Sequence, residues 1–161
     1  MCLRYKEKIA AVLAVASVAL TVALTASKAA SQESYLLPHG EAAQIITVSA
    51  TGQAAIEFNV LTQAIAVKET GPKQTVARFG EVYAFSPAFI AVRVDQPVRL
   101  TFWNLQPDDD HDFALMANNG ESKPMMWVGL PALKKTSYVL IFHKPGLFRF
   151  LCLRHQPEMQ G

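Results

Sequence analysis

Apolar and polar residues alternate in short runs through most of the chain after residue 44, which is the pattern of strands with one buried face. The clearest alternation joins Ile56, Phe58 and Val60, and a β-branched and aromatic run extends from Thr136 to Phe142. Turns that contain Gly or Pro separate the runs: Thr51-Gly52, Thr70-Gly71-Pro72, Ser86-Pro87, Asp95-Gln96-Pro97 and Lys144-Pro145-Gly146. No stretch after residue 30 has a long helical period, so the pattern predicts an all-β fold of the sandwich or barrel type.

The runs differ in how clearly they predict individual strands. Residues 44–70 indicate two or three antiparallel strands, which form either an extra hairpin or an early sheet edge. Apolar residues alternate only in part over residues 74–85, whereas residues 89–94 and 98–105 each predict a strand bounded by turns. Residues 118–120, Asn-Asn-Gly, form a turn by composition.

Residues 1–29 have the composition of an export segment. Three basic residues precede an apolar run from Ile9 to Ala26, and small residues at Ser27 and Ala29 suit a signal-peptidase cleavage site. The run of about 18 residues is also just long enough to span a bilayer, so the segment is either a cleaved signal peptide or an N-terminal membrane anchor. Both interpretations predict an exported domain, in the periplasm or on the outer face of the cytoplasmic membrane, because the basic residues favour a cytoplasmic N-terminus.

Residues 30–43 mix polar residues with Pro and Gly and are interpreted as a linker, which leaves residues 44–161 as the folded domain. The chain of 161 residues has room for one domain with a substantial core and not for two ordinary ones. Its hydrophobic content of 51% and charged content of 17% favour a folded protein over a disordered one.

Much of the positive charge belongs to the export segment. Removing its four basic residues and one acid from the totals of 15 and 13 leaves 11 basic and 12 acidic residues. The remaining chain is nearly neutral and has no basic stripe, so the charge pattern argues against a nucleic-acid partner.

Soft donor side chains are concentrated near the C-terminal end. Cys152 is the only cysteine after the export segment, so an intrachain disulfide framework is excluded there. Such a thiol is buried, paired with another chain or bound to a metal. The eight residues from Cys152 to Met159 also contain His155, and His111 lies about forty residues upstream. Two histidines and a cysteine, with a methionine at a longer bond distance from the metal, are typical of a blue copper site. The pattern therefore predicts one bound copper ion.

Longer stretches around these donors resemble the cupredoxin family over roughly residues 79–161. The matching pieces, in family order, are Tyr83-x-Phe85-x-Pro87-x-x-Ile90-x-Val92, Pro97-Val98-Arg99-Leu100-Thr101-Phe102, His111-Asp112-Phe113 and Phe142-x-x-Pro145-Gly146-x-Phe148-x-Phe150-x-Cys152-x-x-His155-x-x-x-Met159-x-Gly161. The resemblance implies an antiparallel Greek-key β-sandwich that passes single electrons. It also implies four copper ligands: His111, Cys152, His155 and, axially, Met159.

Several assignments leave alternatives. Glu158 could take the axial position in place of Met159, which would make a harder and less blue site. Cys152 could instead be a buried thiol beside a surface histidine, with no metal. Asn104, just before an acidic loop, is a candidate to brace the loop that carries Cys152.

Other candidate groups have simpler explanations. His39 lies in the predicted linker, and His143 lies in a polar turn where a solvated role fits better than a ligating one. Trp103 and Trp127 are expected to pack in the core or on a sheet, and Asp108 to Asp110 form a solvated loop that could repel or orient a charged partner. Three methionines could form a copper(I) cluster, although core packing is their commoner role: Met116, Met125 and Met126.

The chain departs from the family pattern at two places. Relatives with a dinuclear copper centre need a second cysteine four positions after the first, where this chain has Gln156, so the prediction is a mononuclear site. The family usually continues into a further strand after its Met-x-Gly turn, which here is reached at Gly161. Residues 44–70 are a candidate to occupy that sheet edge.

These features together predict an exported electron-transfer protein and not an enzyme, because four protein ligands leave no open metal position for a substrate. A weak, transient contact with a redox partner is expected at the apolar residues beside His155, namely Leu153 and Pro157. Two alternatives remain: a protein that buffers or delivers copper, and an accessory subunit of a membrane oxidase.

Overall fold

The computed structural model describes residues 35–117, 122–155 and 159–161. The signal or anchor segment, the turn predicted at residues 118–120 and the alternative ligand Glu158 lie outside these ranges, so those predictions stay open. Within the ranges described, no helix combines the length and apolar character needed to cross a lipid bilayer.

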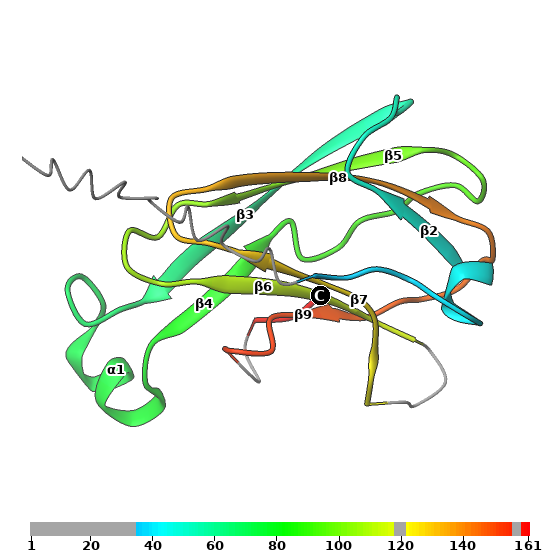
Figure 1. Ribbon diagram of the computed structural model, residues 1–161. Coiled ribbons are helices and arrows are strands. Elements are labelled where there is room, and N and C mark those ends of the chain that lie inside the picture. The colour runs from blue at the N-terminus through cyan, green and yellow to red at the C-terminus, as the bar shows by residue number, and fades with distance from the viewer. Residues whose placement is uncertain (1–34, 118–121, 156–158) are drawn as a thin grey trace, which may run out of the picture. The chain divides into compact units, whose positions relative to one another are not determined.

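Two β-sheets contain most of the regular structure (Figure 1). The first sheet has the order β1-β7-β6-β9 and consists of β1 (Tyr35–Leu36), β6 (His111–Met116), β7 (Pro124–Leu130) and β9 (Phe150–Leu151). The second sheet has the order β2-β8-β5-β3-β4 and consists of β2 (Ile46–Ser49), β3 (Ile56–Ala66), β4 (Val82–Ser86), β5 (Val98–Asn104) and β8 (Lys135–Phe142). The helices of the described residues are a 3-10 turn, η1 (Ala42–Gln44), and α1 (Lys73–Phe79).

The two sheets enclose one hydrophobic core, which confirms the predicted β-sandwich. On β5 the buried side chains of Val98, Leu100 and Phe102 follow the two-residue period of a strand with one face inward. The ring of Phe113 on the facing sheet lies 4.7 Å from that of Phe102 and 5.3 Å from that of Phe150, measured between centroids. Each such buried ring contributes about 1.5–3 kcal/mol to folding.

One strand pair departs from the antiparallel pattern. β3 and β5 run parallel, from Ile56 opposite Val98 to Thr62 opposite Asn104. A parallel pair needs a long crossover, which residues 67–97 provide. β2 and β3 do not pair with each other: β2 lies against β8, and β3 lies between β5 and β4. The hairpin predicted for this early region is therefore wrong, whereas the early sheet edge is found at β2.

In two other segments the structure differs from the strand that their apolar alternation predicts. Lys73 to Phe79 form helix α1, which ends at Gly80, where a φ of 79° suits glycine. Residues 89–94, predicted as a strand, belong to no strand, and Phe89 in this segment is 74% exposed. Alternation predicts a strand only where a neighbouring strand is free to pair with it. The predicted linker also contains β1 and the first two residues of η1.

The strand registers define one end of the sandwich, termed here the site end. β5 ends there at Asn104, β7 ends at Leu130, and β6 begins at His111, directly opposite Leu130. β8 begins at the same end, with Lys135 opposite Trp103.

β3 and β4 continue beyond the site end and form an arm, residues 63–84. β3 leaves β5 at Thr62, opposite Asn104, but its pairing with β4 continues as far as Ala66 opposite Val82. Helix α1 lies at the far end of this arm (Figure 1). The arm thus carries the beginning of β4 past the last residues of β5.

Candidate metal centre

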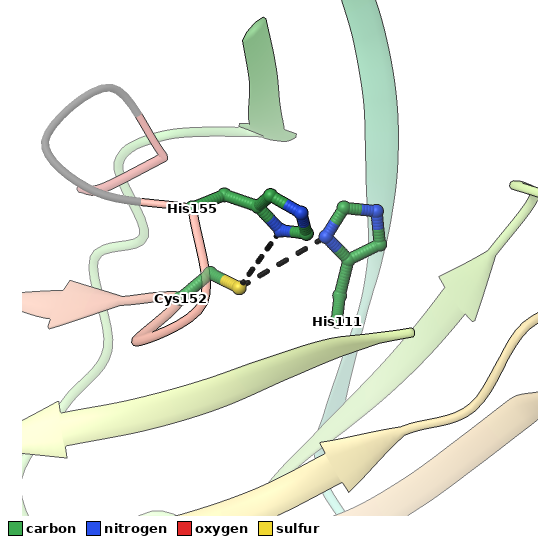
Figure 2. A group of neighbouring side chains, drawn as sticks. All are labelled: His111, Cys152 and His155. Atoms are coloured by element: carbon green, nitrogen blue, oxygen red, sulfur yellow. Dashed lines mark hydrogen bonds between the residues drawn. The ribbon is translucent and has the colours of Figure 1, made fainter. Parts of the chain in front are cut away.

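Three side chains with metal-binding atoms converge at the site end (Figure 2). Nδ1 of His111 lies 3.9 Å from Sγ of Cys152, and Nδ1 of His155 lies 3.5 Å from the same sulfur. The three donor atoms all lie within 4.8 Å of one another. His111 and Cys152 are fully buried and His155 is half-buried, so the donors face an interior space.

The pairing of β6 with β9 brings two distant parts of the chain together at this site. His111 is the first residue of β6, and Cys152 directly follows β9. Ala114 on β6 lies opposite Leu151 on β9. Because the ladder fixes both backbones, the sulfur and the first imidazole are held in a defined relation before any metal binds.

Residues 159–161 pair with the backbone of residues 150–152 beside the site. The N–H of Cys152 donates to the carbonyl oxygen of Met159 at 2.9 Å, and Phe150 and Gly161 exchange two backbone hydrogen bonds of 2.8 Å. The N–H of Met159 donates to the carbonyl oxygen of His155 at 3.1 Å. Met159 is fully buried in the core. These bonds return Met159 to the immediate neighbourhood of Cys152.

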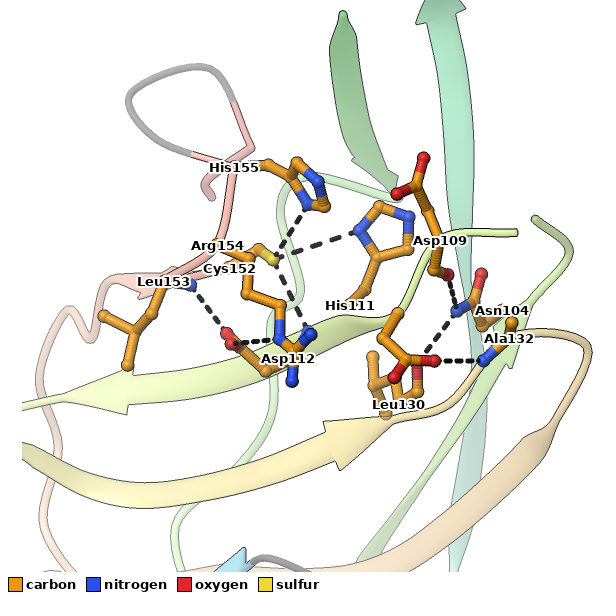
Figure 3. Close-up of polar contacts among 11 residues, drawn as sticks. Asn104, Asp109, His111, Asp112, Leu130, Ala132, Cys152, Leu153, Arg154 and His155 are labelled. Atoms are coloured by element: carbon orange, nitrogen blue, oxygen red, sulfur yellow. Dashed lines mark hydrogen bonds and ion pairs between the residues drawn. The ribbon is translucent and has the colours of Figure 1, made fainter. Parts of the chain in front are cut away.

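Asp112 links the two ligand-bearing segments (Figure 3). Its N–H donates to Sγ of Cys152 at 3.4 Å, and its carboxylate accepts the N–H of Leu153 at 2.6 Å. Nε of Arg154 lies 3.7 Å from the same carboxylate, which is buried with Asp112 only 2% exposed. The sequence interpretation missed this residue. Its position directly after His111 was the signal that could have identified it, since such neighbours often orient ligands.

Asn104 braces the loop that precedes β6 (Figure 3). Its Nδ2 donates to the carbonyl oxygens of Asp109 and Leu130, both at 2.8 Å. Its Oδ1 accepts from Oγ1 of Thr62 at 2.9 Å and from the N–H of Gln106 at 3.0 Å. The full bonding capacity of the amide is used. These contacts reach the acidic loop and the base of the arm, so the bracing role expected of Asn104 is directed to that loop and not to the C-terminal one.

Tyr83, at the start of β4, packs against both histidine rings. Its ring centroid lies 4.8 Å from that of His111 and 4.6 Å from that of His155, and the two imidazoles are 4.6 Å apart. Its hydroxyl donates to the carboxylate of Asp109. The sequence interpretation treated Tyr83 only as part of a strand motif, and no local pattern indicates that the arm would bring it to the site.

Burial controls the protonation of the metal-free site. Burial lowers the pKa of His111 to about 4, and the nearby His155 acts in the same direction, so this imidazole is neutral near pH 7. Burial raises the pKa of the Cys152 thiol, although the N–H of Asp112 opposes the shift. Burial and the hydrogen bond to Asp109 raise the pKa of Tyr83, which therefore stays protonated. A metal ion must displace the thiol proton when it binds.

The donor set fits one copper ion. With bonds of about 2.0 Å to nitrogen and about 2.3 Å to sulfur, as for Zn²⁺, a first-row metal ion would separate these two atoms by about 3.7 Å at an angle of about 120°. The observed nitrogen–sulfur distances of 3.5 and 3.9 Å lie on either side of that value. Two imidazoles, a thiolate and a thioether nearby suit both oxidation states of copper.

The other histidines lie apart from this group. His39 is exposed, with Nδ1 3.4 Å from the carbonyl oxygen of Leu37. His143 pairs with the carboxylate of Asp95 at 2.8 Å and lies 3.2 Å from Oγ1 of Thr47. Neither belongs to a metal-binding group within the described part of the chain.

The predictions for the methionines and tryptophans have mixed outcomes. The three methionines are buried in hydrophobic clusters, which confirms their core role: Met116, Met125 and Met126. Trp127 packs half-buried on a sheet, as expected. Trp103 is 37% exposed, and its Nε1 donates to Oδ1 of Asn59 on the outer face of the second sheet.

Comparison with solved structures gives low sequence identities. Auracyanin B matches with 16% identity and a TM-score of 0.47, covering 73% of this chain and 95% of that one. Auracyanin A, a blue copper protein from Chloroflexus aurantiacus, matches with 14% identity and a TM-score of 0.44, covering 65% and 94%. A multicopper oxidase matches with 15% identity and a TM-score of 0.45, covering 64% of this chain and 40% of that one. No protein-family model and no curated protein matches the chain.

The fold is cupredoxin-like. Two sheets face each other, a histidine begins an inner strand, and a backbone hydrogen bond joins Cys152, at the end of the neighbouring strand, to Met159. The resemblance inferred from the sequence is thus confirmed at the level of the fold and of a type 1-like copper donor set.

Proposed function

We propose that this cupredoxin-like protein binds one copper ion and carries single electrons. The observation that supports the proposal is the convergence of three donor atoms, from His111, Cys152 and His155, within 4.8 Å of one another in a buried space. Met159, whose carbonyl oxygen accepts from the N–H of Cys152, would add its thioether to the proposed ligand set.

Bound copper would supply a Cu(I)/Cu(II) couple, and the residues around it would keep the site unchanged as the electron moves. The β6–β9 pairing fixes two of the donors, and the N–H of Asp112 donates to the sulfur. Burial of His111 and Cys152 excludes water. A rigid, dry site needs little rearrangement on electron transfer, which is the requirement for a carrier.

His155 is the proposed route for the electron because it is the only one of the three donors that reaches the surface. Three exposed leucines lie in the loops of the site end: Leu105, Leu133 and Leu153. The N–H of Leu133 donates to the carbonyl oxygen of Gln106, so two of these loops are directly joined. A small apolar surface of this kind suits a weak, short-lived complex with a redox partner.

The proposal includes export, which rests on the basic residues and apolar run of residues 1–29. The alternative role in copper buffering is favoured only if Met116, Met125 and Met126 are available to bind copper(I). Those side chains lie in the core, so this support is weakened.

The direct test is titration of the full-length chain, carrying Cys2→Ser, with copper(II). We expect one ion per chain, an intense thiolate-to-copper absorption band in the visible region and a compressed copper hyperfine splitting in the EPR spectrum. Cys152→Ser should abolish the band, and His143→Gln should retain it, because His143 lies outside the donor group.

Two results would contradict the proposal. Copper bound without the visible band would point to buffering or to a harder axial ligand such as Glu158. Failure to bind one equivalent of copper would mean that these converging donors do not form a copper site.

A further inference from the structure

We propose that Tyr83 is a positioning residue, which holds the two imidazole rings with Nδ1 toward Cys152 and closes the site to small molecules. This inference rests on the proposed copper site. In it, the arm serves to bring Tyr83 to the histidine rings. It differs from ligand assignment because Tyr83 would act through ring packing and shielding, without touching the metal.

The first argument concerns the orientation of His111. A metal-binding histidine is usually oriented by a hydrogen bond to its second ring nitrogen. In His111 that atom, Nε2, is buried and has no hydrogen-bond partner in the described part of the protein. Tyr83 instead meets this ring nearly edge-on, with an interplanar angle of 72° at 4.8 Å. Ring packing therefore replaces the missing hydrogen bond.

The second argument concerns His155. This residue lies in a loop and not in a strand, so no sheet fixes its side chain. Its ring lies 4.6 Å from Tyr83 and 4.6 Å from His111, which makes a triangle of three rings. Removing one ring of the triangle would leave His155 free to turn away from Cys152.

The third argument concerns access. Tyr83 is 2% exposed, and the two rings it touches lie directly beside the buried sulfur of Cys152. Replacing its phenol by a smaller group opens a space next to both imidazoles on the side of the arm. A small anion or a neutral alkylating reagent would then reach the sulfur more readily, through local opening on that side.

Tyr83 is itself held in place by the site end. Its hydroxyl donates to the side-chain carboxylate of Asp109. The backbone carbonyl oxygen of Asp109 in turn accepts from Nδ2 of Asn104. Asn104 also bonds to Thr62 at the base of the arm. The arm, the acidic loop and the histidine rings therefore form one connected unit.

The test compares Tyr83→Leu, Tyr83→Phe and a matched control, Phe85→Leu, in the full-length chain carrying Cys2→Ser. Phe85 is two residues further along β4, faces the same core and contacts Phe113 and Phe150 instead of the histidines. The control thus removes a similar ring from the same strand, and it reports general loosening of the fold.

In the metal-free protein, the rate of alkylation of Cys152 by iodoacetamide measures access without depending on copper. We expect Tyr83→Leu to react at least about tenfold faster than the parent, and Tyr83→Phe to stay within about threefold because its ring remains. Phe85→Leu should react more slowly than Tyr83→Leu. The two variants are compared in urea concentrations at which their free energies of unfolding are equal.

In the copper-loaded protein, added azide should change the visible spectrum of Tyr83→Leu and leave the parent and Tyr83→Phe unchanged. Alkylation of Tyr83→Leu at the parent rate, or equal rates for Tyr83→Leu and Phe85→Leu, would overturn the proposal. If Tyr83→Leu lacks the native circular dichroism spectrum, Tyr83→Met takes its place under the same criteria. Failure of the parent to bind copper would overturn the proposed function alone, since the alkylation result stands without metal.

Discussion

The two ends of the sandwich differ in how the space between their strands is filled. At the site end, buried polar side chains such as Asn104 and Asp112 bond to several loops at once. At the opposite end, where β5 begins and β8 ends, residues 88–92, Val94 and residues 144–150 line an apolar cavity of about 620 Å³. Its lining includes core rings such as Phe113.

The difference shows where this fold needs fixed atomic positions. Hydrogen bonds are directional, so a network of them places a side chain to within fractions of an ångström. Apolar contacts are non-directional and mainly remove surface from water. Hydrogen bonds from Asp112 hold the Cys152 segment that must meet a metal ion, whereas the end held by apolar contacts tolerates a cavity.

The largest effect is expected from Asn104→Ala at the site end. The substitution leaves the carbonyl groups of Asp109 and Leu130 and the hydroxyl of Thr62 without their partner, so we expect a loss of about 3–5 kcal/mol in unfolding free energy. Urea denaturation measures this. Asn59→Ala, on the exposed face of β3, is the control, and a loss below about 1 kcal/mol for Asn104→Ala would remove the contrast between the ends.

The next effect is a dependence of stability on pH in the metal-free protein. Burial lowers the pKa of His111 from 6.5 to about 4, so the unfolded chain binds a proton in that window and the folded chain does not. Stability is therefore complete above pH 6.5 and falls by about 3 kcal/mol as the pH drops to 4.

Denaturation at several pH values, compared with His111→Gln, measures this contribution. The variant should lose most of the slope between pH 6.5 and 4. His39→Gln, an exposed site, should retain it. An equal slope in the parent and His111→Gln would assign the dependence to other groups.

A smaller effect is expected on the reduction potential from Asp112→Asn. The amide oxygen can still accept the N–H of Leu153, but the buried negative charge that favours Cu(II) is removed. Arg154 partly neutralises this carboxylate, so at an effective dielectric constant near 20 its charge should act on the metal by about 1–2 kcal/mol, and we expect a rise of roughly 40–90 mV.

Voltammetry of the copper-loaded protein measures this shift. The control is Asp108→Asn, which removes an exposed charge from the acidic loop and should change the potential less. An unchanged or lowered potential in Asp112→Asn would show that the carboxylate does not act on the metal through its charge.

The smallest effect is expected at the cavity end, from Leu147→Ser. Leu147 is 77% exposed and lines the cavity, so we expect a change below about 0.5 kcal/mol in stability and none in the visible spectrum of the copper form. A spectral change would show that the two ends are coupled. Denaturation and absorption spectra of the same sample decide this.

The sequence predicted the donors better than their surroundings. Cysteine, histidine and methionine are rare and chemically distinctive, so their spacing pointed to His111, Cys152 and His155 before the fold was considered. The sandwich was predictable because alternation marks most of its strands. Tyr83 was not predictable as a site residue, since its place depends on how far β3 and β4 extend beyond β5.

Pairing is the information that alternation lacks. Residues 89–94 alternate but form no strand, and residues 73–79 form a helix although the surrounding apolar residues alternate in part. Asn104 was recognised as a bracing residue, but its partners depend on which loops meet at the site end. Short-range patterns do not specify which strands become neighbours, and here that choice decides the contacts.

The parallel pairing of β3 with β5 has a consequence for folding speed. These strands cannot form a hairpin across a short turn, because residues 67–97 separate them in the sequence. Closing such a loop loses entropy before its contacts compensate, so refolding is expected in milliseconds to seconds and not in microseconds. Tyr83 lies within that crossover, and the three-ring cluster therefore forms only when the slowest sheet contacts are made.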